Sequence, residues 1–331
     1  MASGSGTRLV LLGTAGGPLP SPVRAGISQA VVAGGRAYLV DCGSGVTRQL
    51  RRARLLSSLH AVFLTHLHSD HACDYFNLFL LGWPILQWGP PVDVYGPGSA
   101  GRLPAPTTER PADRPLSIVN ASNPVPGLAD LTRSQIAAHA YDINVRIREA
   151  GRTDLTELVV PHEIALPPDL EAGPGRVAPP MAPVLVAEDD RVRVTAVLVE
   201  HAPVFPAFAY RFDTADGSVV VSGDTAPCGN LVALARGADV LVHEVFADDI
   251  WAQRPEEVSW EASQREHHLF TAHTALSQVG KVASEAEVGR LVLTHFVPGD
   301  DVLPDEHWLR GLRGTFDGEV TVGSDLLELP L

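Results

Sequence analysis

Cysteine is scarce in this chain. Its 331 residues include three cysteines, Cys42, Cys73 and Cys228, and no two of them form a C-x-x-C pair. Three scattered thiols cannot build a disulfide framework. Cysteine usage of this kind is typical of proteins in a reducing compartment, so we expect a cytoplasmic protein.

Long apolar runs are also missing. The longest apolar stretch, Phe76 to Trp88, is interrupted by Asn77, Gly82, Pro84 and Gln87. A helix that spans a bilayer needs about 20 consecutive apolar residues, so this stretch is too short. The first residues carry one arginine and an apolar run of only four residues, which is unlike a signal peptide. We therefore expect no membrane partner.

Positive charge is in short supply as well. The chain has 25 Lys and Arg against 39 Asp and Glu, a formal net charge of −14, and Lys281 is its only lysine. An acidic chain repels the phosphate backbone of a nucleic acid unless a local basic patch or a bound metal overrides the net field. Composition therefore argues against a nucleic-acid partner. The 45% hydrophobic content indicates a globular protein, and the length allows one large domain or two.

Short apolar runs bounded by glycine alternate with helical patterns. The hairpin signal Gly34-Gly35 joins two apolar runs, and further patterns predict both strands and helices. The expected strands are 8–13, 60–66, 191–201 and 290–296, and the expected helices are 46–59, 70–81, 230–236 and 271–286. This alternation predicts an α/β fold.

The middle of the chain differs in composition. Residues 97–183 carry 14 of the 27 prolines around one helix-like island, 128–151. Long proline-rich segments of this kind are often functional loops. We predict an insertion or lid at about 97–190, which is partly helical. The sequence leaves open whether it forms a lid, a pocket wall or a dimer contact, and His139 in the island is placed to line a pocket.

Histidine, in contrast, is abundant, with thirteen residues in the chain. The densest cluster, His66-Leu67-His68-Ser69-Asp70-His71, lies where an apolar strand ends and a helix is about to begin. His66 and His68 are two residues apart on extended chain and can point the same way, while Asp70 and His71 point to a second position. Four such groups within six residues cannot all reach one zinc ion comfortably. The spacing therefore favours two metal ions.

Other metal-ligating residues end predicted strands further along the chain. His201 ends TAVLVEH, Asp224 ends VVVSGD and His295 ends RLVLTH. Because open α/β sheets gather their sites at the carboxyl ends of strands, we expect these side chains to meet the histidine cluster there.

At these residues the sequence resembles a known family. Thr65 to His71, together with His201, Ser222-Gly223-Asp224-Thr225 and Leu293-Thr294-His295-Phe296, is similar to the metallo-β-lactamase superfamily. More narrowly it resembles the branch that holds ribonuclease Z and the arylsulfatase-like and phosphodiesterase-like hydrolases. The resemblance implies an α/β four-layer αββα sandwich, and a single domain over residues 1–331.

The resemblance also implies two zinc ions per chain, although manganese or iron stays open as the metal in the cell. His66, His68 and His201 would bind the first ion, Asp70, His71 and His295 the second, and Asp224 both. Metal-bound hydroxide would then hydrolyse an ester-type bond. Asp70 would also accept or orient the proton of the nucleophile.

Glu244 and His273 match an acidic–histidine pair that this branch keeps to assist the leaving group. We expect His273 in the first turn of helix 271–286. His243 is expected in the core or behind the ligands. His60, His162, His267, His268 and His307 are expected to be structural. The family often has glycine three residues after the last histidine of the cluster, and here Asp74 stands there.

The length of the segment between His201 and Asp224 indicates which kind of ester the protein would cleave. Ribonuclease Z proper inserts a tRNA-gripping arm there, but here the tight turn Thr214 to Gly217 leaves no room for one. With the net charge, this favours a small-molecule phosphodiester, sulfate or carboxylic ester/lactone. We expect a small anionic or ester substrate, no nucleic-acid partner, and the homodimer common among related hydrolases.

Two alternatives stay open at this point. One is a ribonuclease Z-like tRNA 3′-processing endonuclease. The other is a metal-binding sensor without turnover. A redox di-iron role usually needs a glutamate among the first ligands and an attached flavin domain, and neither is evident.

Overall fold

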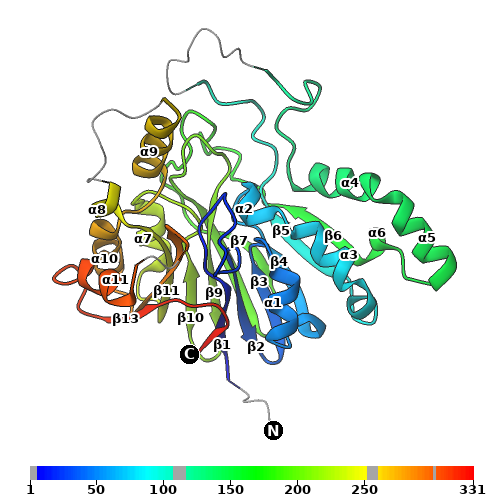
Figure 1. The fold of residues 1–331 in the computed structure, drawn as a ribbon, viewed down its shortest axis with the longest axis horizontal. Coiled ribbons are helices and arrows are strands. Elements are labelled where there is room, and N and C mark those ends of the chain that lie inside the picture. Colours follow the sequence, from blue (N-terminus) through cyan, green and yellow to red (C-terminus); the bar gives the residue numbers. More distant parts are fainter. Residues whose placement is uncertain (1–5, 107–116, 252–259, 301–302) are drawn as a thin grey trace.

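Two seven-stranded sheets form the centre of the molecule (Figure 1). The computed structural model describes residues 6–106, 117–251, 260–300 and 303–331. Short runs of branched and aromatic residues form the strands, and glycine-rich turns separate them, as the sequence pattern predicts. Strand order in one sheet is β14-β1-β2-β3-β4-β5-β6, and in the other β13-β12-β11-β10-β9-β8-β7.

We call the first of these the N-terminal sheet. Its strands are β14 (Leu327–Pro330), β1 (Arg8–Gly13), β2 (Ser28–Ala33), β3 (Arg36–Val40), β4 (Leu59–Phe63), β5 (Val92–Gly96) and β6 (Val159–Glu163). The pairs from β14 to β3 are antiparallel, and those from β3 to β6 are parallel. The predicted hairpin at Gly34-Gly35 joins β2 to β3, and both glycines have positive φ.

The second, C-terminal sheet repeats this layout. Its strands are β13 (Glu319–Val322), β12 (Arg290–Val297), β11 (Val240–Phe246), β10 (Ser218–Val221), β9 (Phe208–Thr214), β8 (Val192–Leu198) and β7 (Val184–Glu188). Pairs from β7 to β10 are antiparallel, and those from β10 to β13 are parallel. Each sheet therefore presents the carboxyl ends of several parallel strands at one edge.

The two sheets pack face to face through aromatic side chains. Phe63 on β4 meets Phe212 on β9 edge-on, with ring centroids 5.2 Å apart. The Tyr210 hydroxyl donates a hydrogen bond of 2.7 Å to the backbone oxygen of Leu64. All three rings involved are fully buried, so this layer contributes hydrophobic stabilisation and a fixed spacing between the sheets.

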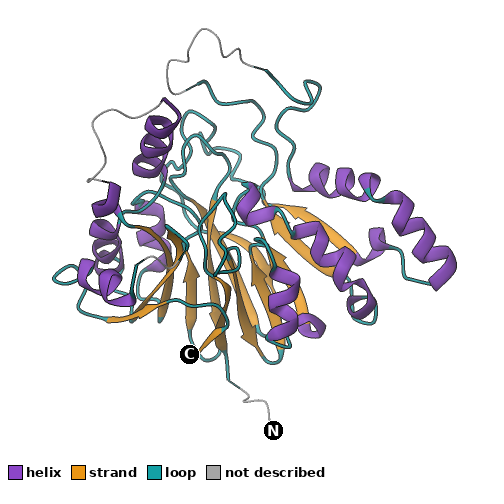
Figure 2. Cartoon of the chain, viewed as in Figure 1, coloured by secondary structure: helices purple, strands orange, loops and turns teal. Residues whose placement is uncertain are grey.

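Helices cover the outer faces of both sheets (Figure 2). On the N-terminal sheet these are α1 (Val46–Arg52), η1 (Leu56–Ser58) and α3 (Tyr75–Leu86), and on the C-terminal sheet α7 (Gly229–Ala235), α10 (Leu276–Glu285) and α11 (Asp305–Gly311). The remaining short or peripheral helices are α2 (Ser69–Ala72), α8 (Asp248–Trp251) and α9 (Trp260–Ala272). The four layers confirm the predicted αββα sandwich.

The proline-rich segment contributes to both sheets. It contains α4 (Leu128–Ala138), α5 (Ala140–Ala150) and α6 (Leu155–Leu158), and it also supplies β6 and β7. These two strands are the outer edges of the N-terminal and the C-terminal sheet, while α4 and α5 project from the body (Figure 1). The predicted island 128–151 is therefore two helices. His139 between them stacks on Phe76, with centroids 5.8 Å apart, instead of lining a pocket.

Three predicted helices have other bounds in the structure. Helix 46–59 ends at Arg52, and Arg54 adopts a positive φ. Helix 70–81 is split around Asp74, whose backbone N–H donates to the backbone oxygen of Cys42 at 3.0 Å instead of to the preceding helical turn. Its carboxylate accepts a 2.6 Å hydrogen bond from the Gly45 backbone. Helix 271–286 begins only at Leu276. Within the described ranges, no helix has the length and apolar character needed to cross a bilayer.

Candidate metal centre

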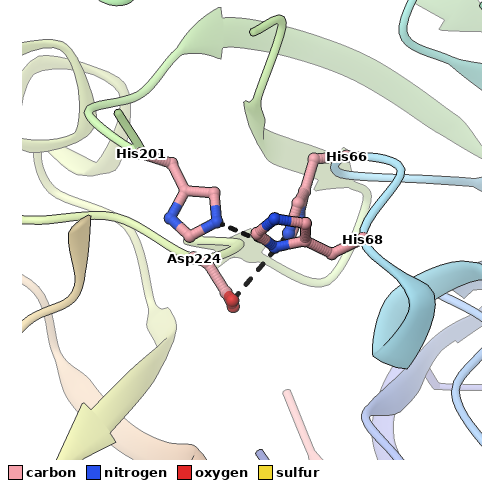
Figure 3. A group of neighbouring side chains, drawn as sticks. All are labelled: His66, His68, His201 and Asp224. Atoms are coloured by element: carbon pink, nitrogen blue, oxygen red, sulfur yellow. Dashed lines mark hydrogen bonds and ion pairs between the residues drawn. The ribbon is translucent and has the colours of Figure 1, made fainter. Parts of the chain in front are cut away.

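The predicted ligands converge at the carboxyl edge of the two sheets, and Figure 3 shows four of them, His66, His68, His201 and Asp224. His66 follows β4, His201 follows β8 and Asp224 follows β10. His295 lies within β12, at a residue with φ of 47° beside an irregularity in the β11–β12 register. This left-handed backbone turns the side chain out of the normal strand alternation. Parallel strand ends thus bring residues more than 200 positions apart into one site.

The first ligand group consists of His66, His68, His201 and Asp224. One ligand atom from each lies within 4.8 Å of the others. The Nε2 atom of His201 is 3.2 Å from Nδ1 of His68, and Nε2 of His66 is 3.9 Å from Oδ2 of Asp224. Three imidazoles and one carboxylate facing a common point are the donor set that zinc prefers.

The second ligand group consists of Asp70, His71, Asp224 and His295. Nε2 of His71 is 3.2 Å from Oδ1 of Asp224 and 3.3 Å from Nε2 of His295. Oδ2 of Asp70 is 3.4 Å from Nε2 of His295. Asp224 therefore belongs to both groups, with one carboxylate oxygen near each. The structure brings together all seven residues that the sequence singled out as metal ligands.

Buried partners behind the ligands fix their orientation. The Asp41 carboxylate accepts 2.8 Å hydrogen bonds from Nδ1 of His71 and from the Thr65 backbone. Nδ1 of His201 donates to the Ala272 backbone oxygen at 2.9 Å. Such bonds set the tautomer and leave Nε2 directed into the site. Sequence reasoning missed Asp41, although its position directly after strand β3 was the same signal that identified Asp224.

Burial keeps three imidazoles neutral. It lowers the pKa of His68 to about 4 and holds the pKa values of His66 and His201 well below the ordinary value. A neutral imidazole keeps a lone pair for a metal ion. At His71 burial acts in the same direction, but the carboxylates of Asp224 and Asp41 outweigh it and raise the pKa of His71. The carboxylates around the second ligand group therefore favour the protonated, positively charged form of His71.

Glu244 and His273 form a buried pair beside the ligands. Oε2 of Glu244 accepts a 2.7 Å hydrogen bond from Nδ1 of His273, and Oε1 accepts one from the Thr225 backbone. Burial lowers the pKa of His273 below its ordinary value. His273 follows α9 and precedes α10, so the expected position in the first turn of a helix is wrong. The pairing itself agrees with the sequence-based expectation.

Two cavities open beside these groups. The central cavity, of about 360 Å³, is lined by the ligands His68, Asp70, Asp224 and His295 and by Arg265, His268 and His273. The proline pocket, of about 240 Å³, lies on the other side of His68 and is lined by Phe205 and by prolines that include Pro97, Pro104, Pro126 and Pro174. The inserted segment thus supplies part of a pocket wall.

The other histidines divide into two kinds. His60, His162 and His307 lie within 3.3 Å of the carboxylates of Asp189, Asp93 and Asp249, and His243 is fully buried with a bond to the Glu244 backbone. These positions agree with the expected structural roles. His268 does not, because it faces the central cavity beside His201 and His273. Neither His268 nor Arg265 carried a motif that would have identified it.

This chain is similar to several known proteins over most of its length. The family model of the metallo-beta-lactamase superfamily matches residues 24–266. Ribonuclease Z of Mycobacterium bovis (strain BCG / Pasteur 1173P2) is 35% identical over 324 residues, covering 96% of each chain. Ribonuclease Z of Mycobacterium avium (strain 104) is 34% identical over 322 residues, with the same coverage. The crystal structure of human tRNase Z, short form, gives a TM-score of 0.62 at 22% identity and covers 97% of this chain and 98% of that one.

The chain belongs to the metallo-beta-lactamase superfamily. It is a metal-dependent hydrolase that acts on ester bonds, as the ligand pattern predicted. Among its relatives, the ribonucleases Z match it over nearly the whole length of both chains.

This finding overturns two expectations from the sequence. A small-molecule ester was the favoured substrate and a nucleic-acid partner was rejected, and the ribonuclease Z relatives contradict both. The turn from Thr214 to Gly217 is tight as expected, with a 3.0 Å hydrogen bond that closes it. The sequence-based expectation gave too much weight to the short turn and to the net charge of the chain. Binding of a phosphate backbone depends on local groups rather than on total charge.

Proposed function

We propose that this protein is a dinuclear zinc ribonuclease Z, which cleaves a phosphodiester bond of tRNA precursors at their 3′ side. The observation that carries the proposal is the 35% identity to a ribonuclease Z across 96% of both chains. A relationship of that extent includes the loops that bear His66–His71, His201 and His295, so it supports a shared reaction as well as a shared fold.

We assign the first zinc ion to His66, His68 and His201, the second to Asp70, His71 and His295, and Asp224 to both. Nε2 of His66 supports the assignment, because it is buried and has no hydrogen-bond partner among the described residues. An orphaned buried nitrogen costs free energy that a bound cation would recover. Bound zinc lowers the pKa of water and offsets the charge of a phosphodiester.

The chain's own residues have separate tasks in this proposal. Asp70, at the rim of the second ligand group, accepts or orients the proton of the attacking water. Glu244 holds Nδ1 of His273, which leaves Nε2 of that ring facing the central cavity. From there the imidazolium form of His273 would donate its Nε2 proton to the departing ribose oxygen, which leaves a neutral ring with its Nδ1–H still bonded to Glu244. We also propose that residues 1–331 form one domain, because each ligand group takes residues from both sheets.

The test is cleavage of an end-labelled precursor tRNA by the zinc-loaded protein, with the cut site mapped at nucleotide resolution. We expect a single cut at the junction of tRNA and 3′ trailer, and loss of cleavage after chelation. Bis-(p-nitrophenyl) phosphate, p-nitrophenyl sulfate and an acyl ester serve as comparison substrates. Efficient turnover of one of these with no cut in the precursor would reject the proposal.

A further inference from the structure

Helix α9 presents two polar side chains to the central cavity that the proposed mechanism does not use. Arg265 and His268 are three residues apart, so they share one face of the helix. Both line the cavity, together with the proposed ligands Asp70 and Asp224. The ring centroid of His268 is 5.1 Å from that of His273. The pair therefore faces the place where a substrate would meet the metal centre.

His268 forms a third histidine group with His201 and His273, but this group is a poor metal site. Nδ1 of His201 is bonded to the Ala272 backbone, and its Nε2 faces His68 at 3.2 Å. Nδ1 of His273 is bonded to Glu244. His201 therefore has no nitrogen to spare for another ion, and His268 is better understood as a group that contacts the substrate.

Arg265 differs in charge from the other residues that line the central cavity. It is the only arginine or lysine among the described residues that line the central cavity, and the structure pairs it with no carboxylate in the ranges it describes. Its side chain is exposed, next to the buried Leu269. A guanidinium binds phosphate through two parallel hydrogen bonds, and it gives more affinity when no carboxylate competes for it.

We propose that Arg265 and His268 bind a non-scissile phosphate of the substrate, that of a nucleotide next to the cleaved bond. Arg265 supplies the charge and His268 donates an N–H hydrogen bond from its ring. The pair holds the RNA strand in register over the metal centre, so both are positioning residues for a polynucleotide. This inference rests on the proposed ribonuclease Z function.

The experiment combines Arg265→Gln with substrates that lack one charge. A precursor RNA carries a neutral methylphosphonate in place of the phosphate on either the 5′ or the 3′ side of the cleaved bond. We expect Arg265→Gln to lower kcat/KM on the unmodified precursor by about 10- to 100-fold, mostly through KM, and Arg265→Lys to restore part of it. At one of the two positions, the methylphosphonate should lower kcat/KM of the wild-type protein by a similar factor. On that substrate, kcat/KM of Arg265→Gln should be little lower than that of the wild type.

Several controls keep this test specific. Arg310→Gln removes an exposed arginine on α11 and should leave cleavage of the precursor unchanged. His268→Ala should reduce kcat/KM by about 10- to 100-fold with zinc content retained, since one hydrogen bond to a charged phosphate is lost. Bis-(p-nitrophenyl) phosphate has a single phosphate, so Arg265→Gln should impair it at least about tenfold less than the precursor.

The outcomes separate this inference from the function it rests on. A wild-type protein that cuts the precursor correctly, with Arg265→Gln equally active, would overturn the inference and leave the function standing. The inference would also be overturned if Arg265→Gln lowered kcat/KM by its full factor on both methylphosphonate substrates, since the two losses would then be independent. A wild-type protein that hydrolyses bis-(p-nitrophenyl) phosphate but not the precursor would overturn both.

Discussion

Asp224 is the one residue that both proposed ligand groups share. Its Oδ1 atom is 3.2 Å from Nε2 of His71, and its Oδ2 atom lies toward His66. It is almost completely buried, so its negative charge is stabilised by these groups and by whatever cation they hold. Loss of this one carboxylate therefore affects both ligand groups at once.

We expect Asp224→Ala to reduce bound zinc from two ions to at most one per chain and to abolish cleavage. The reason is that both proposed sites lose a charged ligand. Metal content by mass spectrometry and cleavage of precursor tRNA check this. Asp142→Ala, at an exposed residue on α5, is the matched control. Full zinc content with normal turnover would contradict the bridging role.

We expect His273→Ala to lower kcat by about 10²–10⁴-fold with both zinc ions retained, because a general acid is lost and no ligand is. Glu244→Gln should act in the same direction, since it weakens the bond that holds Nδ1 of His273. The loss should be small for substrates with a good leaving group such as p-nitrophenolate. An equal loss on good and poor leaving groups would exclude proton donation by His273.

Four of the proposed ligands, His66, His201, Asp224 and His295, could be predicted from the sequence because they follow or end an apolar strand run. The other three, His68, Asp70 and His71, belong to the dense cluster behind His66, and the family resemblance implied their roles. The same pattern carried Asp41, but nothing in the sequence pairs it with His71, 30 residues away. Arg265 and His268 lie on an ordinary polar helix, and only tertiary packing turns that face toward the cavity. Local patterns thus reveal residues at strand ends and not those that the packing of a helix selects.

At the scale of elements, the fold class and most strands follow from periodicity, while helix bounds do not. Strand β1 has the predicted limits, and β12 extends one residue beyond them. Helix α3 begins after Asp74 because the backbone N–H of that residue bonds to the oxygen of Cys42 instead of to the preceding turn, a contact 32 residues away in sequence. Edge strands β6 and β7 were missed because proline-rich sequence surrounds them, and their pairing with β5 and β8 is long-range information.

One polar contact ties an edge of one sheet to the other. Asp189 follows β7 of the C-terminal sheet, and its carboxylate accepts hydrogen bonds from the Tyr38 hydroxyl at 2.6 Å and from Arg36 at 3.1 Å. Both partners belong to β3 of the N-terminal sheet. Although burial alone would raise it, the Tyr38 bond, the backbone N–H groups of Arg191 and Val192 and the charge of Arg36 lower the pKa of Asp189 to about 2.

We expect Asp189→Asn to reduce the free energy of unfolding by about 1 kcal/mol at pH 7, a value that allows for partial exposure. Because the folded-state pKa is depressed, this stabilisation is present above about pH 4, the value for an unfolded aspartate, and is lost as pH falls toward 2. Urea unfolding across this range checks it, with the exposed Glu171→Gln as control. A difference that grows on acidification would contradict the assignment.

At the scale of the whole molecule, the inserted segment is part of the framework. It provides one edge strand to each sheet, and its residues Leu128, Leu155 and Leu158 lie in the same apolar cluster as helices α1 and α3. The segment also contributes prolines to the proline pocket. Fold and site are therefore connected through it, in contrast to a lid that could be removed without cost.

We expect Leu155→Ala to lower the free energy of unfolding by about 2–4 kcal/mol, because a fully buried leucine leaves a cavity. Tyr141→Ser, on the same segment but 87% exposed, should change it by less than about 0.5 kcal/mol. Urea unfolding of the two variants beside the wild type gives both values. Equal stability of all three proteins would show that the segment does not stabilise the fold.

The N-terminal sheet is closed by a strand from the far end of the sequence. Strand β14 pairs with β1 from Arg8↔Pro330 to Leu11↔Leu327. At a synthesis rate of about 5–20 residues per second, roughly 15–60 s separate the emergence of β1 from that of its partner. During that time the nascent chain carries an unpaired strand edge, which is a template for aggregation. We therefore expect slower translation to lower the yield of folded enzyme in the cell, because it lengthens the time for which this edge is unpaired.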